Sequence, residues 1–128
     1  MSLRILVADH DTMSCRAVTE TLRRAGHEVT PIASGEGAKA QLENTAFDVV
    51  MADLTLPGVS GLELLAFVKG KAPETIFIMI SSAEASDGEV EALDMGAFEF
   101  MVKPLDPGLL REVLEEAGAQ IALRSESP

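Results

Sequence analysis

The chain has 128 residues, of which 47% are hydrophobic and 24% charged, so it can bury one core and is too apolar for wholesale disorder. Its formal net charge of −11 argues against direct binding to nucleic acid or anionic lipid, because phosphate contacts need clustered Lys and Arg. We expect no membrane span, since no apolar run in the sequence is long enough.

Five short apolar runs alternate along the chain with segments of helical spacing, which predicts strands followed by helices. The predicted strands are Leu3–Ala8, Val29–Ala33, Phe47–Ala52, Ile76–Ile80 and Phe98–Val102. The predicted helices are Met13–Ala25, Glu36–Asn44, Leu62–Gly70, Asp87–Met95 and Leu109–Ala119. Four strands are apolar enough to predict burial on both faces. The pattern therefore predicts an α/β fold, a doubly wound five-stranded parallel sheet with helices on both faces.

Helix boundaries carry their own signals. Two segments match the capping box, Ser60-Gly61-Leu62-Glu63 and Ser86-Asp87-Gly88-Glu89, and Asp106-Pro107 predicts a cap before a first-turn proline. Three glycines are expected at helix ends: Gly26, Gly70 and Gly96. We expect one domain over residues 1–123, with residues 124–128 as a tail or the start of a linker.

Polar residues follow several predicted strands, and the carboxyl ends of parallel strands form the ligand-binding edge of such a sheet. Asp9 follows the first strand, Asp53 the third, Ser82 the fourth and Lys103 the fifth. This set predicts phosphoryl chemistry, with Asp53 as nucleophile, Mg²⁺ bridging it to the phosphoryl oxygens, and Lys103 and a serine hydroxyl holding the rest. The alternatives are helix-capping acids, most plausible for Asp11, and a solvated lysine.

In order and spacing, four motifs resemble those of response-regulator receiver domains: Ile5-Leu6-Val7-Ala8-Asp9, Asp53-Leu54-Thr55-Leu56-Pro57-Gly58 with Gly61, Ser82-Ala83 and Lys103-Pro104. The resemblance covers almost the whole chain and implies a flavodoxin-like fold. It implies that Asp53 accepts a phosphoryl group, that Lys103 and Ser82 assist, and that Ser82 and Phe100 act as the switch pair. By sequence alone, Phe100 is equally well explained as a core aromatic.

The resemblance also implies a signalling role in the cytoplasm instead of turnover as an enzyme. The phosphoryl donor would be a histidine kinase or a histidine phosphotransfer protein, and the recipient of the signal a downstream output domain or protein. A homodimer stays open. The single cysteine, Cys15, excludes an internal disulfide and predicts a buried, inert thiol, in keeping with a reducing compartment.

The same resemblance implies a site for Mg²⁺, or another divalent cation such as Mn²⁺, formed by Asp9, Asp53, Thr55 and the residue at position 10. The family usually has an acid at position 10, where this chain has His10. Imidazole suits softer metals better than Mg²⁺. Either Asp11 compensates, or His10 is a loop residue beside a weaker site. Thr55 and Glu84 fall where the family sets the lifetime of the phosphoryl group, and Ser81 is expected to point elsewhere.

Three rival functions remain. The His10 substitution favours an interaction module that works without phosphorylation. Asp53-Leu54-Thr55 fits an aspartyl-phosphate hydrolase poorly, because the second acid of such enzymes is replaced by Thr55. The segment Gly35-Glu36-Gly37-Ala38-Lys39-Ala40 resembles a dinucleotide-binding turn, but it follows the second strand and the chain is too short for the full fold.

Overall fold

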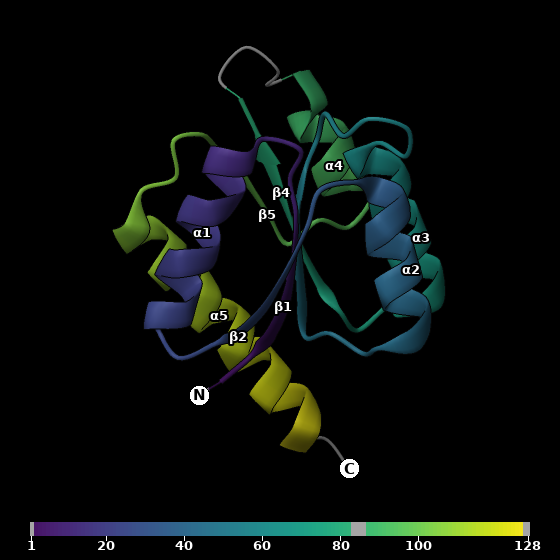
Figure 1. Cartoon of the computed structure of the whole chain (residues 1–128). Helices are drawn as coiled ribbons and strands as arrows, with labels where there is room; N and C mark the ends of the chain where they lie inside the picture. The colour runs from purple at the N-terminus through teal and green to yellow at the C-terminus, as the bar shows by residue number, and fades with distance from the viewer. Residues whose placement is uncertain (1, 83–86, 127–128) are drawn as a thin grey trace.

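The computed structural model describes residues 2–82 and 87–126, in which strands and helices alternate as predicted (Figure 1). The strands are β1 (Arg4–Ala8), β2 (Glu28–Ile32), β3 (Val49–Asp53), β4 (Ile76–Ser81) and β5 (Glu99–Val102). The helices are α1 (Thr12–Arg24), α2 (Gly35–Asn44), α3 (Gly61–Lys71), α4 (Glu89–Asp94) and α5 (Pro107–Glu126). The predicted order of elements is confirmed.

All strand pairs are parallel, and the sheet order is β2-β1-β3-β4-β5. From β1 the chain builds the sheet first to one side, with β2, and then to the other, with β3, β4 and β5. Such a reversal leaves a crevice at the carboxyl ends of β1 and β3, where ligands bind in doubly wound folds. The predicted fold class is confirmed.

The helices form two layers that sandwich the sheet. In Figure 1, α1 and α5 lie on one side of the sheet and α2, α3 and α4 on the other. Strand β1 shows why both layers are needed: Ile5 and Val7 are buried under α1 and α5, whereas Leu6 and Ala8 are buried in the opposite cluster. A central strand that is apolar on both faces can be buried only between two layers of helices.

The edge strands are less buried than the central ones. Every residue of β3 and β4 is buried, but β5 lies at the edge and leaves Val102 42% exposed. At the other edge, Pro31 lies within β2 opposite Val7. Proline has no N–H to donate, and an edge strand is the place in a sheet where it is tolerated. Burial on both faces, predicted for four strands, therefore holds for the central three, in which Arg4 at the start of β1 is the exposed residue.

Several predicted helix boundaries are confirmed. Ser60 and Glu63 form the capping box that starts α3. Asp106 caps α5, because its Oδ1 atom accepts a hydrogen bond of 3.1 Å from the Gly108 N–H. After α1 and α4, Gly26 and Gly96 have φ of 94° and 105°, which glycine adopts without strain.

Other boundaries were predicted wrongly. Gly70 lies within α3, which continues to Lys71 and is capped by Ala72. Helix α4 begins at Glu89, and its N-cap residue Gly88 has no side chain to make a cap hydrogen bond. The predicted capping box at this point includes Ser86, which lies outside the described residues.

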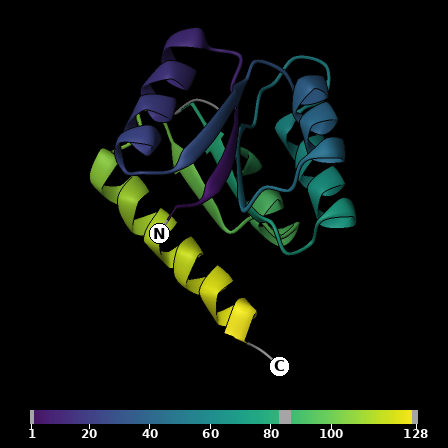
Figure 2. The same ribbon diagram turned by 60° about the horizontal axis from the view of Figure 1, so that its bottom comes forward.

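Helix α5 continues to Glu126, past its predicted end at Ala119. The sequence contains no helix breaker between these two residues, and Ile121 packs against the core formed with α1. Figure 2 shows the last turns of α5 extending beyond the other elements. The first residues of the expected tail are therefore helical. Among residues 2–82 and 87–126, no helix is both long and apolar enough to span a bilayer.

Candidate functional site

Three charged side chains from three strands meet at the carboxyl edge of the sheet. Asp9 follows β1, Asp53 ends β3 and Lys103 follows β5. The Lys103 Nζ atom lies 2.6 Å from Asp53 Oδ2 and 2.9 Å from Asp9 Oδ2. Asp9 is only 2% exposed and Asp53 only 9%. The ammonium therefore offsets two carboxylates that would otherwise repel each other in a poorly hydrated place.

Backbone N–H groups orient both carboxylates. Asp53 Oδ1 accepts a hydrogen bond of 2.8 Å from the Thr55 N–H, and Asp9 Oδ1 accepts one of 3.0 Å from the Asp11 N–H. Asp9 Oδ2 is buried and accepts no hydrogen bond of good geometry in the described part of the chain, although the Lys103 ammonium is close. Each carboxylate is thus held by one oxygen and directs the other toward Lys103.

The pKa of Lys103 reflects this environment. Burial alone would lower it, but the hydrogen bond to Asp53 and the close contacts with the negative charges of Asp53 and Asp9 outweigh burial and raise the pKa above its ordinary value of 10.5. Lys103 is therefore a fixed cation at neutral pH. A cation held between carboxylates is available to an anionic group that arrives at Asp53.

The two carboxylates fit a divalent cation in part. Carboxylate oxygens are the ligands that Mg²⁺ prefers, and Asp9 Oδ2 is a buried acceptor without a hydrogen bond. Within the described residues, however, no group of three or more His, Cys, Asp or Glu side chains is arranged to hold a metal ion. A cation at this edge would need Lys103 to move, and main-chain or water oxygens to complete its ligands.

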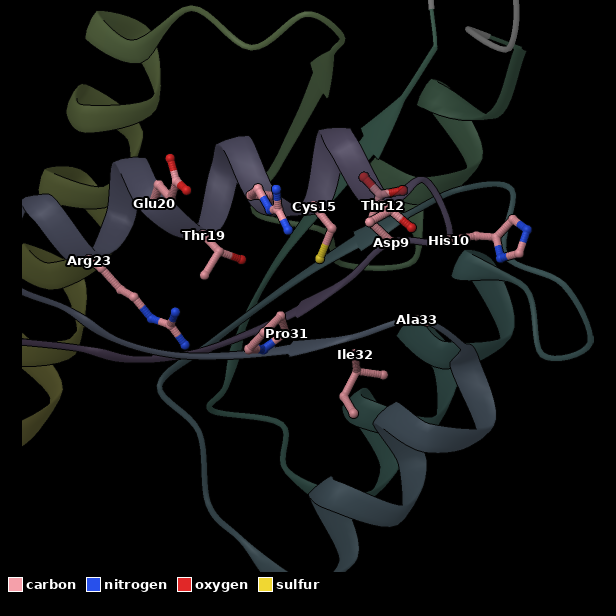
Figure 3. A pocket seen from close by; sticks show the side chains of 11 residues that line it. Asp9, His10, Thr12, Cys15, Thr19, Glu20, Arg23, Pro31, Ile32 and Ala33 are labelled. Atoms are coloured by element: carbon pink, nitrogen blue, oxygen red, sulfur yellow. The ribbon is translucent and has the colours of Figure 1, made fainter.

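The residues after Asp9 do not join this pair. His10 is exposed, and Figure 3 shows its imidazole directed away from the neighbouring labelled side chains. Asp11 is the N-cap of α1, since its Oδ1 atom accepts hydrogen bonds from the Met13 and Ser14 N–H groups at 3.1 and 3.3 Å. Asp11 is thus the helix-capping acid that the simpler alternative predicted.

The other expected site residues are placed as follows. Ser82 is exposed and lines a hollow of 580 Å³ together with Lys103. Ser81 points elsewhere, as expected: it is fully buried and its hydroxyl donates to the Ser82 carbonyl at 3.0 Å. Thr55 lies on the loop after β3 with its side chain exposed. Glu84 lies outside the described residues.

Phe100 is buried, with 8% of its surface exposed, in the core beneath α2, α3 and α4. This placement agrees with the simpler interpretation as a core aromatic. Cys15 is buried on α1, beside a hollow of 380 Å³ that Figure 3 shows from close by. Burial raises the pKa of its thiol, so the thiolate is disfavoured and the residue is expected to be unreactive.

Gly61, which belongs to one of the sequence motifs but had no role assigned to it, closes the loop after Asp53. Its N–H donates to the Leu54 carbonyl at 3.1 Å. A Cβ atom on Gly61 would lie 2.5 Å from the Asp53 carbonyl oxygen and 2.7 Å from Leu54 Cα. Only glycine fits there, so Gly61 allows the start of α3 to pack against the end of β3. Gly61 lies within the Ser60–Glu63 capping box, which marked this helix start in the sequence.

Comparisons with known proteins agree with this geometry. The family model described as "Response regulator receiver domain" matches residues 5–115. The response regulator protein FleR of Pseudomonas aeruginosa is 30% identical over 114 residues, which cover 89% of this chain and 24% of that protein. The transcriptional regulatory protein ZraR of Salmonella typhimurium is 34% identical over 113 residues, which cover 88% of this chain and 26% of that protein.

Among solved structures, a response regulator receiver domain protein from Clostridium thermocellum superposes with a TM-score of 0.87 at 28% identity, covering 94% of this chain and 98% of that one. The chain spans about a quarter of the length of the two curated relatives, 24% and 26%. Since the family model covers most of the chain, this chain belongs to the response regulator receiver domain family.

Proposed function

We propose that this domain accepts a phosphoryl group on Asp53 and changes its protein contacts as a result. The observation that carries the proposal is the ion pair of Lys103 with both Asp53 and Asp9. A purely structural ion pair needs one carboxylate, whereas a second buried carboxylate adds desolvation cost without a cation of its own. Excess acid beside a fixed cation is the arrangement that phosphoryl transfer through a carboxylate requires.

The reaction would use Asp53 as nucleophile. One Oδ atom of Asp53 attacks the phosphorus atom of the donor, the bond from phosphorus to the leaving group breaks, and an acyl phosphate forms on Asp53. The Thr55 N–H holds Oδ1, which leaves Oδ2 free to react once Lys103 shifts. Lys103 then pairs with a phosphoryl oxygen and offsets the charge that the transfer brings in.

Asp9 and Asp53 would hold Mg²⁺ or another divalent cation, which supplies positive charge to the phosphoryl oxygens. The expected ligands Thr55 and His10 would take part through a main-chain oxygen and through an imidazole turned inward. His10 is exposed on the loop after β1 and would have to rotate to reach the carboxylates. We therefore expect weaker binding of Mg²⁺ than an acid at this position would give.

Partners follow from the chemistry. A protein with a phosphorylated histidine, such as a histidine kinase or a histidine phosphotransfer protein, would be the donor in the cytoplasm. The signal would pass to an output domain or to a separate protein, with Ser82 and Phe100 as the residues that respond. Relatives such as ZraR are about four times as long as the matched region, which covers 26% of ZraR. We expect the output function to reside outside the residues of this domain.

The test is intact-mass spectrometry after incubation with acetyl phosphate, with and without Mg²⁺. The expected result is one phosphoryl adduct that requires Mg²⁺ and disappears in Asp53→Asn. Asp11→Asn is the matched control, because Asp11 caps α1 and lies outside the proposed chemistry. If the wild type forms no adduct at any metal concentration, while His10→Asp also fails, the domain is an interaction module that does not use phosphorylation.

A further inference from the structure

The first turn of α2 packs against the loop that follows Asp53, which we call the β3–α3 loop (residues 54–60). A Cβ atom on Gly35 would lie 2.2 Å from the Val59 carbonyl oxygen and 2.7 Å from Val59 Cβ. A Cβ on Gly37 would lie 3.1 Å from the Ser34 hydroxyl. Gly35 is thus explained by close packing between α2 and this loop, whereas Gly37 is explained by its closeness to Ser34 and Ile32, the residues just before α2.

Glu36 lies between those two glycines and reaches the same loop. Its Oε1 atom accepts a hydrogen bond of 3.5 Å from the Val59 N–H. A Cβ on Gly58 would lie 2.3 Å from Glu36 Oε2, so the carboxylate rests directly against the Gly58 backbone. Gly58 has φ of 74°, a conformation in which successive N–H groups can turn toward one anion.

The β3–α3 loop in turn orients Asp53. At its start, the Leu54 N–H donates to the Ile80 carbonyl at 2.7 Å, and the Thr55 N–H donates to Asp53 Oδ1 at 2.8 Å. Leu56 anchors the middle of the loop in the core, with 6% of its surface exposed. After Leu56, the Glu36 side chain contacts the loop from outside, as the hydrogen-bond acceptor of the Val59 N–H. Its removal would let Gly58 and Val59 move and would loosen Thr55 three residues earlier.

We propose that Glu36 is a positioning residue for phosphoryl transfer, acting through the β3–α3 loop on the Thr55 N–H and hence on Asp53. The inference rests on the proposed function, because it assigns Glu36 a part in that reaction. It does not make Glu36 a ligand of the phosphoryl group. Its position on a neighbouring helix, 23 residues before its hydrogen-bond partner, explains why no motif marks it.

The test compares Glu36→Ala and Glu36→Gln with Glu43→Ala, a control on an exposed residue of the same helix. With saturating Mg²⁺ and acetyl phosphate, Glu36→Ala should phosphorylate about fivefold more slowly, the effect of losing roughly one net hydrogen bond. The half-saturating concentrations of donor and Mg²⁺ should stay unchanged, since neither binds Glu36. Glu36→Gln keeps an acceptor oxygen and should restore most of the rate, whereas Glu43→Ala should match the wild type.

A second variant tests the contact itself. Gly58→Ala would push the Glu36 carboxylate aside, so Gly58→Ala and Glu36→Ala together should slow the reaction less than the product of their separate effects. Fully multiplicative effects, or a wild-type rate in Glu36→Ala, would overturn the proposal.

Amide hydrogen exchange separates this proposal from the proposed function. Exchange at Val59 and Thr55 should be faster in Glu36→Ala than in Glu43→Ala. If the wild type takes up no phosphoryl group, the proposed function fails, and with it the catalytic role of Glu36. Faster exchange would then still establish the contact with the loop. Unchanged exchange at both residues would overturn the positioning of the loop by Glu36, whatever the phosphorylation result.

Discussion

Lys103 Nζ and Asp53 Oδ2 are 2.6 Å apart, although 50 residues separate them in the chain. The contact joins the end of β3 to the residue after β5, two elements that are separated in the sheet by β4. It fixes where the ammonium lies relative to the proposed nucleophile. It also makes the stability of this edge depend on one cation.

Lys103→Met should destabilise the domain at neutral pH in the absence of metal. The variant leaves Asp9 and Asp53 buried and facing each other without a cation, and breaking a buried ion pair in this way costs about 3 kcal/mol. Saturating Mg²⁺ should recover part of that loss, because the cation replaces the missing charge. Urea denaturation with EDTA and with Mg²⁺ measures both effects. Lys71→Met, on an exposed residue of α3, is the control, and an equally small effect in both variants would contradict the prediction.

Gly61→Ala should lower the free energy of unfolding by about 2 kcal/mol, in the range of overpacking substitutions. The new Cβ would lie 2.5 Å from the Asp53 carbonyl oxygen, which is backbone and cannot move aside cheaply. Gly70→Ala is the matched control on the same helix, because no atom lies within 4 Å of its Cβ. That control should be neutral or stabilising by up to about 1 kcal/mol. Thermal or urea unfolding measures the stability of the two variants. Equal stabilities would contradict the close packing of Gly61 against the end of β3.

Stability should fall with acid partly through His27. Its Nδ1 atom accepts a hydrogen bond of 3.0 Å from the Leu3 N–H, and burial lowers its pKa below the ordinary value of 6.5. Between the folded and unfolded pKa values the unfolded chain binds more protons, so this contribution is complete above pH 6.5 and is lost as the pH falls through the folded value.

His27→Gln keeps an acceptor oxygen but does not titrate in this range. The free energy of unfolding should therefore depend less on pH below 6.5 in His27→Gln than in the wild type, as measured by urea denaturation across pH 5–7. His10→Gln serves as the control, since His10 is exposed and has no hydrogen bond to another described residue. Parallel curves for wild type and His27→Gln would rule out the contribution of His27.

His10→Asp should strengthen Mg²⁺ binding about tenfold, because it adds a carboxylate oxygen next to Asp9 where imidazole is a poor ligand for this ion. His10→Asn supplies a neutral side chain of the same shape and should bind Mg²⁺ much as the wild type does. Isothermal titration calorimetry gives the dissociation constants. Equal constants for all three proteins would mean that position 10 does not contribute to the metal site.

The fold and the meeting of Asp9, Asp53 and Lys103 were predictable, because strand periodicity places residues after parallel strands at one edge of the sheet. The neighbourhood of Glu36 was not. Its contact with Val59 depends on how α2 packs against a loop, and the local pattern of glycines around Glu36 fits several turns equally well. Long-range packing of exposed polar side chains has no periodic signal in sequence.

Some helix ends were predictable from the sequence and others were not. The end of α1 was marked by Gly26, whose φ of 94° stops the helix, whereas Gly70 has negative φ and simply continues α3. Glycine is permissive, so it permits a helix end without imposing one. The extension of α5 to Glu126 depends on tertiary contacts such as that of Ile121 with the core, which the local sequence does not specify.

The most direct measurement of the central claim identifies the phosphorylated residue. After incubation with acetyl phosphate and Mg²⁺, sodium borohydride reduces an aspartyl phosphate to homoserine, and peptide mass spectrometry then shows which position has changed. We expect homoserine at position 53 alone, dependent on Mg²⁺ and strongly reduced in Lys103→Met. Homoserine at another aspartate, or none while the protein remains folded, would contradict the assignment of Asp53 as the phosphoacceptor.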